Sequence, residues 1–217
     1  MLTILGKGNS IINQFISELR DVEIQQDRMR FRRNLERIGE IFAYEISKQL
    51  EWSNKEITTP LGIAEMQVLK EQPVIAAIMR AGLPLHQGVL NYFDYAGNAF
   101  ISAYRKHDKA GSFDIQMDHV SSPDIEGKVL ILSDPMIASG ASIVLAYKAM
   151  LEKGKPSHTH IISVLASNEG LKYVKSQTGA NVSIWIGCVD EELTAQSYIV
   201  PGLGDAGDLA YGTKNNS

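Results

Sequence analysis

Several features are scarce in this 217-residue chain, and each scarcity excludes a class of protein. A single cysteine, Cys188, excludes an internal disulfide and the usual multi-cysteine zinc sites. No apolar run approaches the roughly 20 residues that span a bilayer, and no basic region followed by an apolar one opens the chain. Positive charge is also scarce: the 25 acidic residues outnumber the 21 lysines and arginines, so the formal net charge is −4. We therefore expect a cytoplasmic protein that is neither a general nucleic-acid binder nor a binder of anionic membranes.

The residues that are present are ordinary for a globular protein, with 44% hydrophobic and 21% charged. The length suits one sizeable core, so we predict a single domain over residues 1–217. Apolar spacing predicts helices over residues 11–19, 26–50, 84–93, 143–151 and 169–175, and buried strands over residues 73–79, 99–104, 129–132, 158–165 and 182–189. Residues 56–59 are interpreted as a short edge strand closed by Pro60, while residues 61–69 are ambiguous.

The most informative stretch is residues 128–142, which has the pattern of a strand, a tight loop and a helix. Asp134 ends the apolar strand, and small residues around Gly140 lead into the helical pattern. The first N–H groups of a helix have no intrahelical partner and lie at the positive end of its dipole, so such a corner can hold a phosphate. The stretch lacks the Gly-Lys-Ser/Thr ending of a P-loop and the spaced glycines of a dinucleotide fold. An ordinary strand-to-helix connection with Ser142 as a cap explains these residues equally well.

Two other strand ends carry a cation. Arg80 follows the strand at residues 73–79, and the glycine after it leaves bare backbone beside the guanidinium, which favours a second phosphate pocket. Arg105 follows the strand at residues 99–104 and precedes a polar segment, about residues 107–127, that we interpret as a mobile hairpin lid. Two simpler explanations stay open: a surface arginine that pairs with a carboxylate, and a basic cluster on a flexible loop.

Residues 198–213 combine apolar side chains with glycines that prevent a long helix, namely Gly202, Gly204, Gly207 and Gly212. The segment is too apolar for a disordered tail, so it must fold as irregular backbone. Backbone of this kind exposes N–H and C=O groups that can bind the edge of a flat heterocycle. A purely structural C-terminal clasp is the alternative.

Three further groups of residues have simpler interpretations. The five arginines between Arg28 and Arg37 form a solvated helix face, because glutamates share the helix. His158 and His160 alternate along one strand, and without a third metal ligand in view they are interpreted as a surface pair. Cys188 lies in an apolar run and is expected to be a small buried side chain.

Three motifs carry a resemblance to a known family. They are Arg80-Ala-Gly, Asp134-Pro-Met and Tyr198-Ile-Val-Pro-Gly-Leu-Gly-Asp-Ala-Gly-Asp208, and together they resemble the motifs of the uracil phosphoribosyltransferases. The resemblance implies an α/β fold with a central, mostly parallel sheet flanked by helices, and a C-terminal hood over about residues 191–217. It implies transfer of the 5-phosphoribosyl group from phosphoribosyl diphosphate to uracil, giving UMP and diphosphate in pyrimidine salvage. It also implies Mg2+, small-molecule partners rather than nucleic acid or membrane, and a homodimer or higher homo-oligomer.

The resemblance further implies a role for each site residue. Arg80 and Arg105 would hold the diphosphate, Asp134 would face the ribose hydroxyls and Asp205 would contact phosphoribosyl diphosphate; these four form the expected catalytic set. Residues Met136 to Ser142 would hold the 5-phosphate. The whole loop that binds phosphoribosyl diphosphate would be Asp134, Pro135, Met136, Ile137, Ala138, Ser139, Gly140, Ala141 and Ser142. Uracil would be bound through Ile199, Gly204, Asp205 and Ala206. No residue is expected to bind magnesium directly, since the substrate diphosphate and water would hold it.

The phosphate loop departs in two places from the family's commoner Ala-Thr-Gly-Gly-Ser. Ser139 replaces threonine and keeps the hydroxyl, whereas Ala141 replaces the second glycine, which is harmless at a negative φ and costly at a positive one. Two other functions stay open: a phosphoribosyltransferase for another base such as a purine, and a non-catalytic nucleotide-sensing regulator on the same fold. The C-terminal motif argues for uracil, and the net charge of −4 disfavours the regulator.

Overall fold

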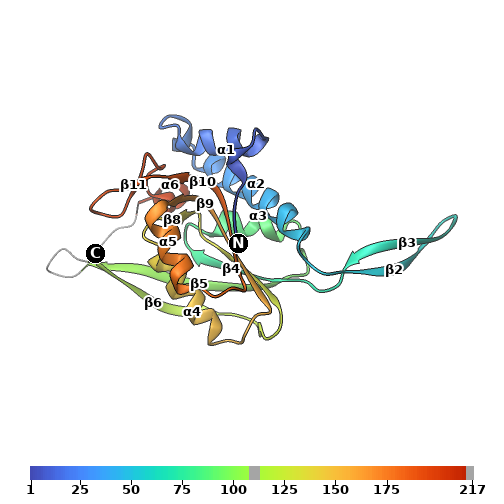
Figure 1. Cartoon of the computed structure of the whole chain (residues 1–217). Coiled ribbons are helices and arrows are strands. Elements are labelled where there is room, and N and C mark those ends of the chain that lie inside the picture. The colour runs from blue at the N-terminus through green and yellow to red at the C-terminus, as the bar shows by residue number, and fades with distance from the viewer. Residues whose placement is uncertain (108–112, 214–217) are drawn as a thin grey trace.

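The centre of the protein is a mostly parallel sheet that helices cover on both faces (Figure 1). This computed structural model describes residues 1–107 and 113–213, without the side chains of residues 103–118. The eight-stranded sheet has the order β1 (Leu2–Ile4), β10 (Val182–Asp190), β9 (His158–Ser167), β7 (Val129–Ser133), β4 (Val74–Met79), β5 (Gly97–His107) and β6 (Phe113–Ser121), and β8 (Met136–Ile137) pairs with β9. Neighbouring strands run parallel, except that β6 runs antiparallel to β5.

The remaining elements are helices and two short hairpins. The helices are η1 (Leu5–Lys7), α1 (Ile11–Arg20), η2 (Ile24–Gln26), α2 (Arg28–Ser47), α3 (Leu83–Leu90), α4 (Ala141–Leu151), α5 (Asn168–Gln177) and α6 (Ala206–Tyr211). Outside the main sheet, β2 (Trp52–Thr59) pairs with β3 (Gly62–Leu69), and β11 (Glu192–Leu193) pairs with β12 (Ile199–Val200). Within the described ranges, no helix combines the length and apolar character needed to cross a membrane.

Strand side chains alternate between two apolar clusters, one on each face of the sheet. In β4, Ile75 belongs to the cluster with α1, α2 and α3, whereas Val74, Ala76 and Ile78 belong to the cluster with α4 and α5. Successive residues of a strand point to opposite faces, so a strand that is covered on both faces has to be apolar throughout. This explains why the buried strands appear in the sequence as continuous apolar runs, and it confirms the predicted fold class.

The order of the strands reverses between β4 and β7. After β4 the chain adds β5 on one side, and after β7 it adds β9 and β10 on the other side. In an open parallel sheet, such a reversal opens a crevice at the carboxyl ends of the strands, where ligands bind. Arg80 directly follows β4, and Asp134 directly follows β7. The topology therefore places these two residues on neighbouring sides of the crevice.

The predicted core helices and strands are confirmed, and their ends shift for identifiable reasons. The long helix, predicted from residue 26, begins at Arg28 because Asp27 caps it: Asp27 Oδ1 accepts a hydrogen bond from the N–H of Arg30 at 3.0 Å. By contrast, β1 has three residues, which is too short for its pattern to be predicted.

The strand predicted at residues 56–59 is confirmed as part of β2, but it is not an edge strand of the main sheet. β2 and β3 form their own two-stranded sheet around a turn at Pro60 and Leu61, and this hairpin arm, residues 52–69, projects away from the rest of the chain (Figure 1). Leu61, Ile63 and Met66 are exposed on the arm. A strand-like pattern is the same in an edge strand and in a separate hairpin, so the sequence could not specify the pairing partner.

The edge of the sheet opposite the crevice contains a buried histidine. His160 is 2% exposed, so its interpretation as a surface residue is wrong. Its Nδ1 accepts a hydrogen bond from Trp185 Nε1 at 3.0 Å, and its ring lies 4.7 Å from the ring of His158. Burial, followed by repulsion from His158, lowers the pKa of His160 to about 3. Burial also lowers the pKa of His158, whose Nε2 lies 2.9 Å from Ser183 Oγ.

The protein should therefore lose stability in mild acid. An unfolded histidine binds a proton near pH 6.5, whereas folded His160 stays neutral down to about pH 3, so the unfolded state binds more protons between these values. The free energy of unfolding should fall as the pH drops below 6.5, by up to about 1.4 kcal/mol for each pH unit. Denaturant unfolding at several pH values measures this slope, and His160→Gln should flatten it. An unchanged slope in the variant would assign the acid sensitivity to other groups.

Candidate active site

The loop after β4 contacts residues 198–213, which are called the C-terminal segment below. Arg80 Nη2 donates to Asp208 Oδ1 at 3.2 Å and to the carbonyl oxygen of Gly212 at 3.2 Å. Both partners in the ion pair are about one third exposed, so the pair contributes little stability and can exchange for another anion. Arg80 Nε is buried and has no hydrogen-bond partner among the described residues. A buried donor without a partner costs free energy, so this nitrogen suits a ligand anion.

Helix α6 brings Asp205 to the same place. Asp205 caps this helix, because its Oδ1 accepts a hydrogen bond from the N–H of Asp208 at 3.0 Å. A Cβ atom added to Gly207 would lie 3.2 Å from Asp205 Oδ1 and 3.9 Å from Arg80 Nη2. Arg80 and Asp205 therefore both lie next to Gly207, although they are far apart in the sequence.

The corner after β7 is the predicted phosphate loop. Asp134 Oδ1 accepts a hydrogen bond from the N–H of Met136 at 3.1 Å, and α4 begins at Ala141. Gly140 has a φ of +82°, and an added Cβ there would lie 2.8 Å from the carbonyl oxygen of Gly170. The loop thus needs glycine at this position, and the first N–H groups of α4 lie just beyond the carboxyl end of β7.

The departures of the loop from the family pattern cause no backbone strain. In the described part of the chain, Ser197 is the only residue other than glycine with a positive φ, so Ala141 has a negative φ. The condition under which its methyl group is harmless is therefore met. Ser139 keeps a hydroxyl in the loop, and its Oγ accepts a long hydrogen bond of 3.5 Å from the N–H of Ala141.

Arg105 lies on β5 beyond the end of β4. Met79, the last residue of β4, pairs with Ser102, and β5 continues beside β6 as far as His107. The backbone of Arg105 is thus on the crevice side of the sheet, while its side chain is among those that are not described.

The pairing of β5 with β6 agrees with the hairpin predicted after Arg105, although residues 108–112 lie outside the described ranges. Ser121, the last residue of β6, pairs with Phe100 near the start of β5. Residues 122–127 therefore lie at the opposite edge of the sheet, and Ile125 there is fully buried. This last part of the predicted lid packs in the core and does not belong to the hairpin.

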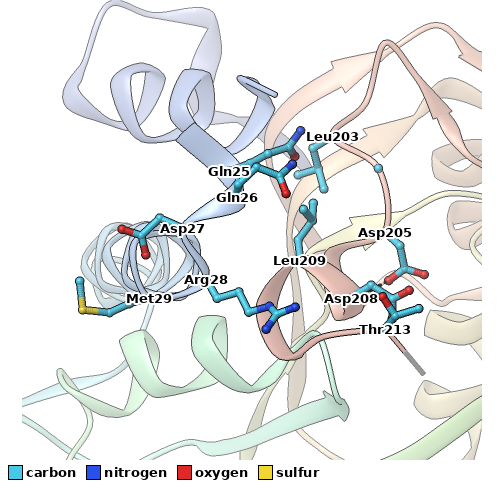
Figure 2. Close-up of a pocket in the computed structure, with 11 residues that line it drawn as sticks. Gln25, Gln26, Asp27, Arg28, Met29, Leu203, Asp205, Asp208, Leu209 and Thr213 are labelled. Carbon is cyan, nitrogen blue, oxygen red and sulfur yellow. Dashed lines mark hydrogen bonds between the residues drawn. The ribbon is translucent and has the colours of Figure 1, made fainter. Parts of the chain in front are cut away.

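A cavity of about 690 Å³ separates the C-terminal segment from the start of α2 (Figure 2). Its lining comes from the start of α2 and the turn before it (Gln25, Gln26, Asp27, Arg28 and Met29) and from the C-terminal segment (Leu203, Gly204, Asp205, Asp208, Leu209 and Thr213). Among the predicted site residues, Gly204 and Asp205 line this cavity, whereas Arg80 and the phosphate loop do not. Asp208 stands in the quoted C-terminal motif and could have been predicted, but no local signal connects residues 25–29 to it.

The other predicted uracil residues differ in exposure. Ile199 is 4% exposed and Ala206 is 4% exposed, so their side chains pack in the core and only their backbone groups remain for a ligand. Gly204 has a φ of +94° and is exposed. The C-terminal segment is thus irregular backbone around one short helix, as predicted.

The interpretation of the α2 arginines as a solvated face holds for Arg28, Arg30 and Arg33, which are exposed, but it is wrong for Arg32, which contacts the C-terminal segment. Arg32 Nη1 donates to the carbonyl oxygen of Ala210 at 2.7 Å. Arg30 makes a fork with Glu18, with Nη2 to Oε1 at 2.8 Å and Nε to Oε2 at 2.8 Å. Hydrogen bonds from Arg30, then Asn34, lower the pKa of Glu18 to about 2. Charge alone does not reveal such partners, because they lie in other elements.

The carboxylates at the site fit a magnesium ion that keeps its water and substrate ligands. Asp205 and Asp208 lie beside Arg80, where a bound diphosphate would bring its own oxygens. Mg2+ commonly uses one or two carboxylates together with phosphates and water. Within residues 1–107 and 113–213, no three His, Cys, Asp or Glu side chains are grouped to hold a metal alone.

Fold and site together define a class of protein. The chain is an α/β protein whose strand order reverses beside a glycine-dependent helix start and an arginine with an unpaired buried donor. These are features of a site for a phosphorylated ligand at the carboxyl edge of a sheet.

Comparisons with known proteins narrow this class. The family model described as uracil phosphoribosyltransferase matches residues 7–213. A protein of Porphyromonas gingivalis named uracil phosphoribosyltransferase is 55% identical over 210 residues, which cover 97% of each chain. One of the same name from Methanococcus vannielii is 37% identical, covering 91% of this chain and 84% of its own. A solved structure of an Aquifex aeolicus protein has a TM-score of 0.87 at 29% identity and 98% coverage of both chains. The chain belongs to the uracil phosphoribosyltransferase family.

Substitutions in the loop should separate its two small residues. Gly140→Ala should cost about 1–3 kcal/mol of stability, because the new methyl group meets the Gly170 carbonyl and φ is left-handed. Ala141→Gly should cost less than about 1 kcal/mol, because it removes one half-buried methyl group at a helix start. Denaturant unfolding of both variants measures the difference. Equal losses would show that the loop adapts its backbone.

Proposed function

We propose that this chain transfers the 5-phosphoribosyl group of phosphoribosyl diphosphate to uracil and releases diphosphate and UMP. The observation that carries the proposal is the contact of Arg80, from the β4 corner, with α6 of the C-terminal segment. This contact joins the two motifs that the family would use for diphosphate and for the base. Membership in the family over residues 7–213 supplies the reaction.

The reaction forms a bond between uracil N1 and ribose C1 while the bond from C1 to the diphosphate oxygen breaks. The N1 proton is released, and the bond electrons leave with the diphosphate. Positive charge develops on the ribose and negative charge on the leaving group, so groups fixed at both ends accelerate the step. No general base needs to be assigned, because holding the two substrates in line can itself supply much of the rate.

Each predicted residue has a task in this proposal. Arg80 and Arg105 bind the diphosphate, and Asp134 accepts from the ribose hydroxyls. The 5-phosphate lies in the loop from Pro135 to Ser142, against the first N–H groups of α4. Uracil is bound through backbone groups of Ile199, Gly204 and Ala206, and Asp205 contacts phosphoribosyl diphosphate directly or through water.

A magnesium ion bound to the substrate would neutralise part of the diphosphate charge. The residues that would hold its water ligands are Asp205 and Asp208, which flank Arg80. The chain's own contribution is to orient the diphosphate through the guanidinium groups and to exclude water from the ribose. The cytoplasmic location and the role in pyrimidine salvage stay predictions.

Purified protein with uracil, phosphoribosyl diphosphate and Mg2+ should form UMP and diphosphate, which chromatography and a diphosphate-release assay measure. Cytosine and the purine bases should give little product, because the backbone pattern that accepts uracil leaves their polar groups unpaired. Turnover with a purine alone would favour a transferase for another base. Binding of UMP without turnover would favour a nucleotide-sensing regulator.

Arg80→Ala tests the diphosphate site in the same assay. The KM for phosphoribosyl diphosphate should rise at least about tenfold, since hydrogen bonds to charged groups contribute about 1.5–3 kcal/mol. The melting temperature should change little, because the ion pair with Asp208 is partly exposed. Arg33→Ala is the matched control, as it removes an exposed arginine that pairs with Glu36 on α2. Equal loss of affinity and stability would make Arg80 a structural residue.

We further propose that the protein is a homodimer joined in part by the arm. An isolated two-stranded hairpin is marginally stable in water, yet the arm exposes Leu61, which is 100% exposed, and Ile63, which is 72% exposed. A second copy that covers these side chains would stabilise it.

Light scattering should therefore give the mass of two chains. The double variant Leu61→Ser, Ile63→Ser should dissociate into single chains at a higher protein concentration than the wild type. Tyr95→Ser, at an 85% exposed side chain outside the arm, is the control. A wild-type mass of one chain at all concentrations would exclude the dimer.

A further inference from the structure

The end of α1 is joined to the end of β10 by a fork-shaped ion pair. Arg20 Nη1 donates to Asp190 Oδ2 at 2.8 Å, and Arg20 Nη2 donates to Asp190 Oδ1 at 2.7 Å. The side chains are 20% and 6% exposed, respectively. Burial by itself would lower the pKa of Arg20, but the carboxylate of Asp190 outweighs it and raises the pKa. The two parallel hydrogen bonds of the fork therefore hold both side chains in one geometry.

Both members of this pair also bind the backbone of one residue in the C-terminal segment. Asp190 Oδ2 accepts a hydrogen bond from the N–H of Gly202 at 2.9 Å, and Arg20 Nη1 donates to the carbonyl oxygen of Gly202 at 3.1 Å. Gly202 is buried with a φ of +59°, and an added Cβ would lie 2.1 Å from the carbonyl oxygen of Ile199. These two hydrogen bonds thus fix the orientation of the peptide groups before and after Gly202.

Gly202 lies between two residues of the proposed uracil site, Ile199 and Gly204. Recognition by backbone groups depends on the direction of each N–H and C=O, because no side-chain rotamer can correct an error. Sites that must hold a ligand within a fraction of an ångström need supporting contacts around them. The fork is such a contact, and it comes from α1 and β10, which do not otherwise belong to the site.

We propose that Arg20 and Asp190 are positioning residues that set the affinity and selectivity for the base by fixing the backbone at Gly202. This inference rests on the proposed function. Neither residue is among those proposed to contact the substrate. A role in stability alone would not require this geometry, since replacing a buried ion pair by apolar residues is often neutral or stabilising.

The test compares Arg20→Gln and Arg20→Lys with Arg30→Gln. The matched control breaks a second fork, between Arg30 of α2 and Glu18 of α1, which makes no hydrogen bond to Gly202 in the described part of the chain. Arg20→Gln should raise the KM for uracil at least about tenfold. It should also reduce the preference for uracil over cytosine. The KM for phosphoribosyl diphosphate should change less than about threefold. Arg20→Lys should restore only part of the affinity, because an ammonium group cannot form the fork. Arg30→Gln should lower the melting temperature without the change in KM for uracil.

A second measurement does not depend on turnover. Hydrogen exchange in a peptide covering residues 199–204 should be faster in Arg20→Gln and Asp190→Asn than in the wild type or Arg30→Gln. Parallel changes in both KM values, or equal exchange in Arg20→Gln and Arg30→Gln, would overturn the inference. A wild-type protein that forms no UMP would instead refute the proposed function, and the exchange rates would still test the positioning of Gly202. If Arg20→Gln does not fold, Arg20→Lys keeps the charge and serves both measurements.

Discussion

The reversal of strand order between β4 and β7 is the constraint on which the rest of the site depends. Parallel strands end at one edge, and the reversal separates the chain connections there so that a ligand can enter between them. Arg80 and Asp134 follow neighbouring strands because β4 pairs with β7, although 53 residues lie between them in the sequence. Arg80, at this edge, also contacts Asp208 and Gly212 near the C-terminus.

Arginines supply local positive charge in a chain whose net charge is negative. A chain with a net charge of −4 has to bind a polyanion, so cations must be placed locally. Arg80 faces the site, whereas Arg20 and Arg32 hold the C-terminal segment through its carbonyl oxygens. The same residue type therefore serves in ligand binding and in positioning, and only the partners distinguish the two roles.

The motifs were the part of the site that the sequence could reveal. The loop at residues 134–142 and the segment at residues 198–208 are contiguous, and their small residues have conformational meaning that can be read locally. The arm, the buried His160 and the anchoring of residues 122–127 were misjudged because each depends on contacts between distant elements. The fork of Arg20 with Asp190 and Gly202 spans the chain and has no local signature.

By itself, the sequence determined the fold class, the two glycine-dependent corners and the resemblance to a family, because strand burial, helix starts and motifs are properties of neighbouring residues. Tertiary structure alone decided which partners the arginines have, where β2 and β3 pair, and how the C-terminal backbone is oriented. The physical reason is that hydrogen bonds and ion pairs act over a few ångströms, and only folding brings residues from opposite ends of the chain to that distance.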